Sequence, residues 1–216
     1  MRQIVKGAEP ASLMTHRQTP PCDYDNYRPK DDLRHALVTE QRGLCCYCMG
    51  RVHNGPTTMK IEHWRCQSRH PDEQLNYQNL LGACLGGNGQ PFHKQHCDTR
   101  KGDSELQWNP ADATHHIETR VRYELDGSIH ADVAAFDKQL HQVLNLNLPL
   151  LKNNRKGVYD AVLAWWRSER SRIQGPVPRQ RIERERDRHV SGSGQLSPYG
   201  QVAVWLLGQK LARMAA

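Results

Sequence analysis

The sequence predicts an α+β protein of 216 residues, with a metal-binding core in residues 1–131 and a helical extension in residues 132–216. Two observations predict the core. Two spaced pairs of cysteines surround one Glu-His pair, and further along the chain an Asp-Gly turn joins two strand-like segments. A third observation predicts the extension, because apolar residues after this turn recur at helical spacing.

The first elements of the core lead the chain to the first cysteine pair. Residues 3–6 are expected to form a short strand. Asp31 is suited to cap a helix, and Gly43 is the glycine at which that helix is expected to end. Residues 60–64 are then expected to form a second short strand, which carries the Glu-His pair.

The second half of the core is expected to begin with a helix. Residues 76–84 contain two adjacent leucines that would face inward from such a helix. The glycines and the proline of residues 86–91 predict a loop. A β-hairpin is expected from residues 117–125 and 128–131, because the Asp-Gly pair between them readily adopts the positive φ of a tight turn.

The extension is expected to be helical. Residues 136–144 and 158–166 carry apolar side chains at helical spacing, and Pro149 suits the first turn of the second helix. Residues 175–197 are rich in Arg and interrupted by Pro and Gly, which predicts a linker or a mobile arm. The alternative for residues 179–188 is a solvated helix, because Arg alternates there with Glu and Asp. Ser197 is then expected to begin a last helix.

The charge balance favours a polyanionic partner. The chain has 30 Lys and Arg residues against 23 Asp and Glu residues, a net charge of +7. Nucleic acid is the leading candidate on this electrostatic argument, and DNA is preferred to RNA. No run of 18 apolar residues and no signal-peptide core is found, so we expect a cytoplasmic protein with no membrane partner. Seven cysteines in that compartment favour metal ligands plus spare thiols.

Four cysteines have the character of a structural zinc site. Cys45 and Cys48 have the two-residue gap of a zinc knuckle, which lets both thiolates reach one tetrahedral ion. Cys84 and Cys97 have twelve residues between them, and the glycine-rich segment 85–96 can loop out between them. The predicted cofactor is therefore Zn²⁺ bound by these four thiolates.

Other ligand sets stay open at this point. Cys46 is a substitute for Cys45, although the shorter spacing suits chelation less well. His93 or His96 is a substitute for one of the thiolates. The plain alternative is a set of buried cysteines that bind no metal, since free cysteines are often buried.

A second group of residues suits phosphoryl chemistry. Glu62 and His63 follow each other in the predicted strand, and Asp98 comes directly after Cys97. A carboxylate pair suits a hard cation, and a neutral imidazole suits a general base. Because neighbours on a strand point to opposite faces, Glu62 and His63 serve one site only if the strand ends or bends there.

These motifs together resemble those of the HNH (ββα-metal, His-Me finger) nucleases, in which a short hairpin and a helix grip one divalent ion. The chain also resembles the PtuB family, the HNH nucleases of Septu anti-phage systems and of some retron systems. That resemblance is carried by MRQIVK at residues 1–6 with Pro10 and Leu13, CCYC at 45–48, IEHW at 61–64, YQN at 77–79, CDTRKGD at 97–103, and LNLN at 144–147 with Arg155.

The resemblance implies a role for each residue of the second group. His63 would activate water, Glu62 and Asp98 would hold one Mg²⁺ or Mn²⁺, and Asn79 would hold the loop that bears the histidine. Many relatives have Asn or His where this chain has Asp98, but a carboxylate is the better ligand for a hard ion. The alternative for Asn79 is a polar helix residue that faces water.

The resemblance also implies partners. Arg100 and Lys101 lie where basic residues follow the motif and would contact phosphate, although a solvated helix end is the ordinary alternative. The family works beside a PtuA-type ATPase in phage defence, so residues 132–216 are the expected partner-binding region. Two competing functions are a zinc-ribbon nucleic-acid binder without catalysis and a module that only docks the ATPase.

Overall fold

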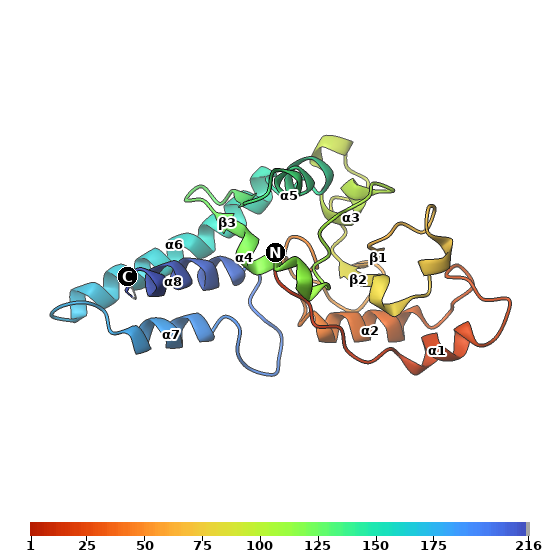
Figure 1. Ribbon diagram of the computed structural model, residues 1–216, viewed down its shortest axis with the longest axis horizontal. Coiled ribbons are helices and arrows are strands. Elements are labelled where there is room, and N and C mark those ends of the chain that lie inside the picture. Colours follow the sequence, from red (N-terminus) through yellow and green to blue (C-terminus); the bar gives the residue numbers. More distant parts are fainter. Residues whose placement is uncertain (215–216) are drawn as a thin grey trace.

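A computed structural model describes residues 1–214 of the protein (Figure 1). The fold mixes helices with two small antiparallel sheets, each of two strands within the described residues. Helices α1 (Ala11–Arg17) and α2 (Lys30–Glu40) lie at one end of the longest axis with strands β1 (Lys60–His63) and β2 (Leu80–Ala83). The other end is formed by three helices, α6 (Pro149–Arg172), α7 (Arg179–Asp187) and α8 (Gln201–Ala212).

Helix α2 matches the predicted helix with a different start. Pro29 occupies the N-cap position, and Asp31 lies in the first turn instead of capping the helix. After the helix ends, Gly43 adopts a φ of +73° and its N–H donates to the carbonyl of Val38 at 2.8 Å. The strand predicted at residues 3–6 does not form, although the Ile4 N–H donates to the Pro110 carbonyl at 2.8 Å.

The helix predicted at residues 76–84 is wrong. The segment forms a 3₁₀ turn, η2 (Tyr77–Asn79), followed by strand β2. Strand β2 pairs with β1 in an antiparallel register that sets His63 opposite Leu80 and Lys60 opposite Ala83. All four residues of β2 are buried, so the strand has no polar alternation to distinguish it from a short helix by sequence.

The predicted hairpin forms in a shorter version. Strand β3 (Val121–Tyr123) pairs with β4 (Ile129–Ala131), and a one-turn helix, α4 (Ile117–Arg120), occupies the start of the predicted first strand. At the turn, Gly127 has a φ of +83°, and a Cβ there would lie 2.0 Å from the Lys152 carbonyl oxygen. The turn therefore requires glycine both for its φ and for its close contact with α6.

Between the hairpin and α6 lie two short helical segments. Helix α5 (Ala134–Lys138) runs directly into η5 (Gln139–Val143), which is a single turn of π-helix. The remaining 3₁₀ turns are η1 (Pro71–Glu73), η3 (Phe92–Lys94) and η4 (Ala113–His115). Helix α3 (Cys97–Lys101) follows η3 and packs near η5.

The segment predicted as a linker or mobile arm contains α7, which corrects that prediction. Ile182 is fully buried from α7, and the helix packs against α8. Its charges are also paired: Arg179 lies 2.8 Å from Glu183, and Arg181 lies 2.6 Å from Glu169 of α6. One apolar anchor among i,i+4 ion pairs gives little hydrophobic periodicity, so the sequence pattern resembled a linker.

The hydrophobic interior has two parts that divide within α6. The larger cluster includes Phe136, Leu140 and Leu151, which lie beyond the predicted boundary at residue 131. The smaller cluster joins Val162 of α6 to Ile182 of α7 and to α8. The predicted extension is therefore helical, but its first helices belong to the main core. No helix within residues 1–214 has both the length and the apolar character that a membrane span requires.

The segment 189–200, called the strap below, connects the helical end to the turn that holds the first cysteine pair by hydrogen bonds. The Arg42 guanidinium donates to four carbonyls of this segment, including those of Val190 at 2.7 Å and Gly192 at 2.7 Å. Two backbone bonds extend the contact: Leu196 N–H donates to the Arg42 carbonyl at 3.0 Å, and Tyr199 N–H donates to the Met49 carbonyl at 3.1 Å.

Candidate metal centre and candidate active site

Four cysteines from three segments meet in the interior. Cys45 and Cys48 lie in the turn after α2, Cys84 directly follows β2, and Cys97 is the first residue of α3. One sulfur atom from each lies within 4.8 Å of the other three. The Cys97 backbone has a φ of +54°, an unfavourable value for a non-glycine residue, and this conformation accompanies the entry of the thiol into the cluster.

The spacing of the sulfurs suits zinc. The Sγ atoms of Cys45 and Cys97 are 3.9 Å apart, and those of Cys48 and Cys84 are 3.8 Å apart. Zn–S bonds of about 2.3 Å place the sulfurs of a tetrahedral site about 3.8 Å apart. The four cysteines could therefore hold a metal such as zinc, and the predicted set of thiols is confirmed as a cluster.

Groups around the cluster support thiolates. Backbone N–H groups of Gly50 and Cys84 donate to the sulfurs of Cys48 and Cys45, each at 3.3 Å. Burial raises the pKa of the Cys45 thiol, but hydrogen bonds from the neighbouring thiols outweigh burial and hold it well below its ordinary value. Hydrogen bonds from N–H groups to sulfur are what a bound zinc thiolate needs as outer support.

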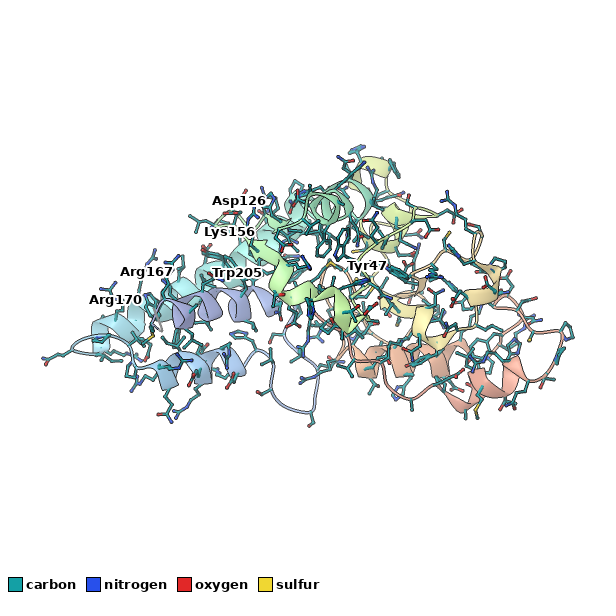
Figure 2. All side chains as sticks on the ribbon, viewed as in Figure 1. Tyr47, Asp126, Lys156, Arg167, Arg170 and Trp205 are labelled. Atoms are coloured by element: carbon teal, nitrogen blue, oxygen red, sulfur yellow. The ribbon has the colours of Figure 1, made fainter. Side chains whose placement is uncertain are left out.

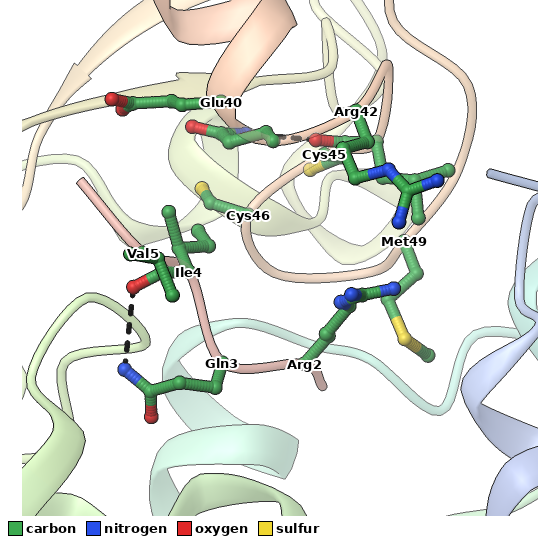
Figure 3. Close-up of a pocket in the computed structure, with 11 residues that line it drawn as sticks. Arg2, Gln3, Ile4, Val5, Glu40, Arg42, Cys45, Cys46 and Met49 are labelled. Atoms are coloured by element: carbon green, nitrogen blue, oxygen red, sulfur yellow. Dashed lines mark hydrogen bonds between the residues drawn. The ribbon is translucent and has the colours of Figure 1, made fainter. Parts of the chain in front are cut away.

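The three alternative ligands lie outside the cluster. Cys46 lines a small cavity beside Ile4 and Glu40 (Figure 3), and burial raises its pKa well above the ordinary value. His96 lies beside the cluster, with Nδ1 3.2 Å from the Cys97 sulfur, which is the position of an outer contact. His93 is exposed on η3.

The second predicted group gathers at a shallow depression next to this cluster. Its lining joins the end of β1 to α3 and to the loop after β1, and it includes Glu62, His63 and Asp98. The β1 strand ends at His63, which lets both members of the Glu-His pair face one depression. Strand β1, which pairs with β2, carries Glu62 and His63, and helix α3 carries Asp98.

His63 is held in one orientation and one tautomer. Its Nε2 lies 3.0 Å from the Gln74 carbonyl oxygen, and a carbonyl only accepts, so Nε2 carries the proton. The Nδ1 lone pair of the neutral ring is then left to accept a proton. The edge of the Tyr24 ring packs against the imidazole at 4.5 Å between centroids, and burial lowers the pKa of His63 below its ordinary 6.5.

Asn79 ties down the loop that follows His63. Its Oδ1 accepts from the Arg65 N–H at 2.7 Å, and its Nδ2 donates to the carbonyls of Arg65 at 3.0 Å and Glu73 at 3.2 Å. The side chain is buried, so it does not face water as the alternative interpretation expected. Asn79 is therefore a positioning residue between η2 and the loop.

Glu62 is buried among partners that the sequence did not indicate. Its Oε1 accepts from the Tyr47 hydroxyl at 2.7 Å and lies 2.9 Å from the Lys101 Nζ. Tyr47 was missed because its only signal is its place between the cysteines of the first motif, where an aromatic residue is ordinarily a core residue.

Glu62 and Asp98 are neighbouring carboxylates whose negative charges repel each other. Burial raises the pKa of Glu62 well above its ordinary value, and the neighbouring Asp98 carboxylate raises it further, whereas Lys101 opposes both effects. Asp98 is partly exposed and lies 3.3 Å from the Lys60 Nζ. Two neighbouring carboxylates, one buried and one partly exposed at the depression, are the kind of donor set that suits a hard divalent cation.

The two basic residues predicted to contact phosphate both contact other groups of the protein, and Lys101 is buried whereas Arg100 is partly exposed. Lys101 is buried, and its ammonium donates to the His63 carbonyl at 2.8 Å besides pairing with Glu62. Arg100 stacks on the Phe92 ring at 3.5 Å and donates to the Phe92 carbonyl at 2.7 Å. These placements differ from the exposed contacts that the motif suggested: Lys101 supports Glu62 and the end of β1, and Arg100 anchors η3 to α3.

No family model matches the chain, and no curated protein is significantly similar to it.

Proposed function

We propose that the protein is a metal-dependent endonuclease of the HNH type, which hydrolyses phosphodiester bonds of nucleic acid. The observation that carries the proposal is the orientation of His63 at a depression that is also lined by the buried Glu62 and the partly exposed Asp98. Its Nε2 is committed to the Gln74 carbonyl, which leaves Nδ1 as the acceptor. A purely structural zinc ribbon has no need of a general base beside two carboxylates.

In this proposal His63 Nδ1 takes the proton from the attacking water. The imidazole is neutral because burial lowers its pKa, so it is in the basic form near pH 7. Asn79 holds the loop against which His63 is positioned. The Gln74 carbonyl, which accepts from Nε2, stabilises the ring as it becomes positively charged.

Glu62 and Asp98 would hold the divalent cation, Mg²⁺ or Mn²⁺. When bound, such a cation polarises the phosphate and stabilises negative charge on the leaving oxygen. Lys101 and Tyr47 fix the Glu62 carboxylate by donating to one of its oxygens, which leaves the other oxygen for the ion. The four-cysteine cluster next to the depression would hold a structural zinc that keeps β1, β2 and α3 together.

The charge of the chain supports a polyanionic substrate, and DNA is the proposed one. Of the 30 Lys and Arg residues, 13 lie in residues 149–216, together with only 5 of the 23 Asp and Glu residues. That segment therefore carries a net charge of +8, and Figure 2 shows Lys156, Arg167 and Arg170 along α6. Such a surface raises the local concentration of nucleic acid.

A role in anti-phage defence beside a PtuA-type ATPase is proposed from the sequence resemblance, as is the cytoplasm as the compartment. The helical end with α6, α7 and α8 is the proposed docking region, since it lies at the opposite end of the molecule from the depression (Figure 1). Co-purification with an ATPase encoded beside this chain tests the partnership independently of cleavage.

Cleavage is tested with the purified chain on plasmid DNA and on tRNA, with and without Mg²⁺ or Mn²⁺. His63→Ala is expected to lower the rate by about 10²–10⁴-fold, because only the general base is lost. His35→Ala is the matched control, since His35 is an exposed histidine of α2. Cation-dependent cleavage that survives in His63→Ala would contradict the proposal. Binding without cleavage under every cation would favour a zinc-ribbon binder instead.

A further inference from the structure

A second group of metal-ligand residues lies on the hairpin and the helices that follow it. His130 of β4, Asp137 of α5 and His141 of η5 each offer one ligand atom, and these atoms all lie within 4.8 Å of one another. The His130 Nδ1 is 3.4 Å from the Asp137 Oδ1, and the His141 Nε2 is 3.2 Å from the same oxygen. None of these residues belongs to the four-cysteine cluster or to the depression around His63.

The two distances suit ligands of one ion better than direct ion pairs. Charge-assisted hydrogen bonds between imidazolium and carboxylate are shorter, at about 2.7–2.9 Å. Metal–nitrogen and metal–oxygen bonds of about 2.0–2.1 Å in a tetrahedral site place neighbouring ligand atoms about 3.3 Å apart. The observed 3.2 and 3.4 Å separations are of that size.

The Asn147 amide next to His141 does not block metal binding by a nitrogen of that ring. The Asn147 Nδ2 lies 2.9 Å from Nδ1 and 3.4 Å from Nε2 of this ring. A donor in the ring plane that bonds to one nitrogen lies much farther from the other, because the two lone pairs point in different directions. The amide therefore lies over the ring face and occupies neither ring nitrogen in the ring plane.

The ligands are fixed in place by the backbone. The Asp137 Oδ1 accepts from the Ala131 N–H at 2.9 Å, which orients the carboxylate. Asn147 is itself held by Ile129, whose N–H donates to its Oδ1 at 2.9 Å. His141 lies in the single π-helical turn, a conformation that is rare and often found at functional sites.

The site is also open to solvent. The side chains of His130, Asp137 and His141 are 31%, 35% and 28% exposed. An ion bound here keeps room for water ligands, unlike the buried cysteine cluster.

We propose that His130, Asp137 and His141 form a second metal site, which takes a first-row divalent ion such as Zn²⁺ through two imidazoles and one carboxylate. Imidazole with carboxylate suits borderline ions of this class. The ion ties β4 to η5. The turn that follows η5 is joined to the cysteine cluster, since the Leu144 carbonyl accepts from the Cys97 N–H at 2.9 Å. The site therefore stabilises the region next to the cluster without sharing a ligand with it.

The full-length protein is first loaded with zinc at its cysteine cluster and then titrated with Zn²⁺ by calorimetry. We expect a second, weaker equivalent in the wild type, and we expect His130→Ala and His141→Ala each to lose it while keeping the first. His115→Ala is the control, as another partly exposed histidine. Asp137→Asn keeps the acceptor for the Ala131 N–H but loses the charge, so it is expected to weaken the second equivalent without unfolding the turn.

A second measurement needs no variant. Nitrogen NMR of the histidine rings in the wild type is expected to show shifts of His130 and His141 on addition of the second equivalent. The proposal is overturned if the wild type binds no second equivalent, if the two alanine variants keep it, or if other histidines shift instead. A failure of cleavage assays would not affect these outcomes, because the site does not depend on the proposed nuclease activity.

Discussion

The two ends of the molecule are held together by different kinds of interior. The end around β1, β2 and α3 buries polar groups, among them Glu62, Asn79 and Lys101, next to four cysteines. The end around α6, α7 and α8 buries apolar side chains such as Ile182 and Leu207. The first end combines an apolar core with buried hydrogen-bonded polar groups and a cysteine cluster that could hold a metal, whereas the second depends on ordinary helix packing.

The same two ends differ in charge. Residues 149–216 have a net charge of +8, which leaves −1 for residues 1–148, where the candidate active site lies. Under the proposed function, long-range attraction of nucleic acid would belong to the helical end and bond cleavage to the other end. Affinity for nucleic acid and the rate of cleavage would then be open to independent change by mutation.

The largest expected effect is the loss of the metal. Structural zinc contributes about 10–16 kcal/mol in small zinc domains, so a chelator or Cys48→Ser is expected to unfold residues 30–103. Hydrogen exchange is expected to show this loss, with less change in α7 and α8. Cys22→Ser is the control, because Cys22 lies outside the cluster. If the metal-free protein kept full hydrogen-exchange protection in β1 and β2, this end of the molecule would not depend on a metal.

A smaller effect is expected from a cavity at the helical end. Ile182→Ala removes a fully buried side chain between α7 and α8, and such changes cost about 2–5 kcal/mol. Denaturant unfolding measures the loss, and metal content is expected to stay the same. Leu150→Ala, at a side chain that is 63% exposed, is expected to change stability by less than about 0.5 kcal/mol. Loss of zinc from the Ile182→Ala variant would show that the two ends are not independent.

Asn79→Ala is expected to have a moderate effect at the candidate active site. The change removes three partly buried hydrogen bonds and leaves backbone groups of Arg65 and Glu73 without their partner, which costs about 1–3 kcal/mol. Cleavage is expected to fall further than stability does, because the loop after His63 loosens. Asn88→Ala changes an exposed asparagine and serves as the control. Equal cleavage by the two variants would exclude a positioning role.

The smallest effect on stability is expected from arginines on the outside of α6. Arg167, Arg170 and Arg172 are exposed and have no ion pair within residues 1–214. Replacing all three with Ala is expected to lower the salt dependence of DNA binding by about 0.9 log units for each lost phosphate contact. The same changes at Arg179, Arg181 and Arg188, which are paired with carboxylates, are expected to do less. An unchanged salt slope in both sets would place the DNA contact elsewhere.

The sequence predicted the parts of the site that depend on chemistry. Four thiols with ligand spacing converge as expected, since few other arrangements use cysteines in that pattern. The Glu62–His63 pair meets Asp98 at one depression. The pattern could not reveal β2, because a fully buried strand of four residues lacks periodicity.

The sequence also could not reveal which charges are internal. Lys101 follows the Cys97-Asp98 motif at a position where an exposed contact to phosphate was expected, yet it is buried against Glu62. Burial of a lysine depends on the position of its partner, here 39 residues away in the sequence, so local composition carries no signal of it. A helix at residues 179–188 was expected as the alternative to a linker, but its packing could not be predicted for a related reason, because a distant carboxylate, Glu169, pairs with Arg181.

The strap formed by segment 189–200 has a consequence for synthesis on the ribosome. Arg42 finds its carbonyl partners about 150 residues later in the chain, with separations from 148 to 152. Chain growth proceeds at about 5–20 residues per second, so Arg42 waits roughly ten seconds or more for these partners. During that interval the turn that carries Cys45 and Cys48 lacks its outer cover, and contacts of such long range form late in folding. The nascent protein thus exposes its metal-binding turn well before the chain can cover it.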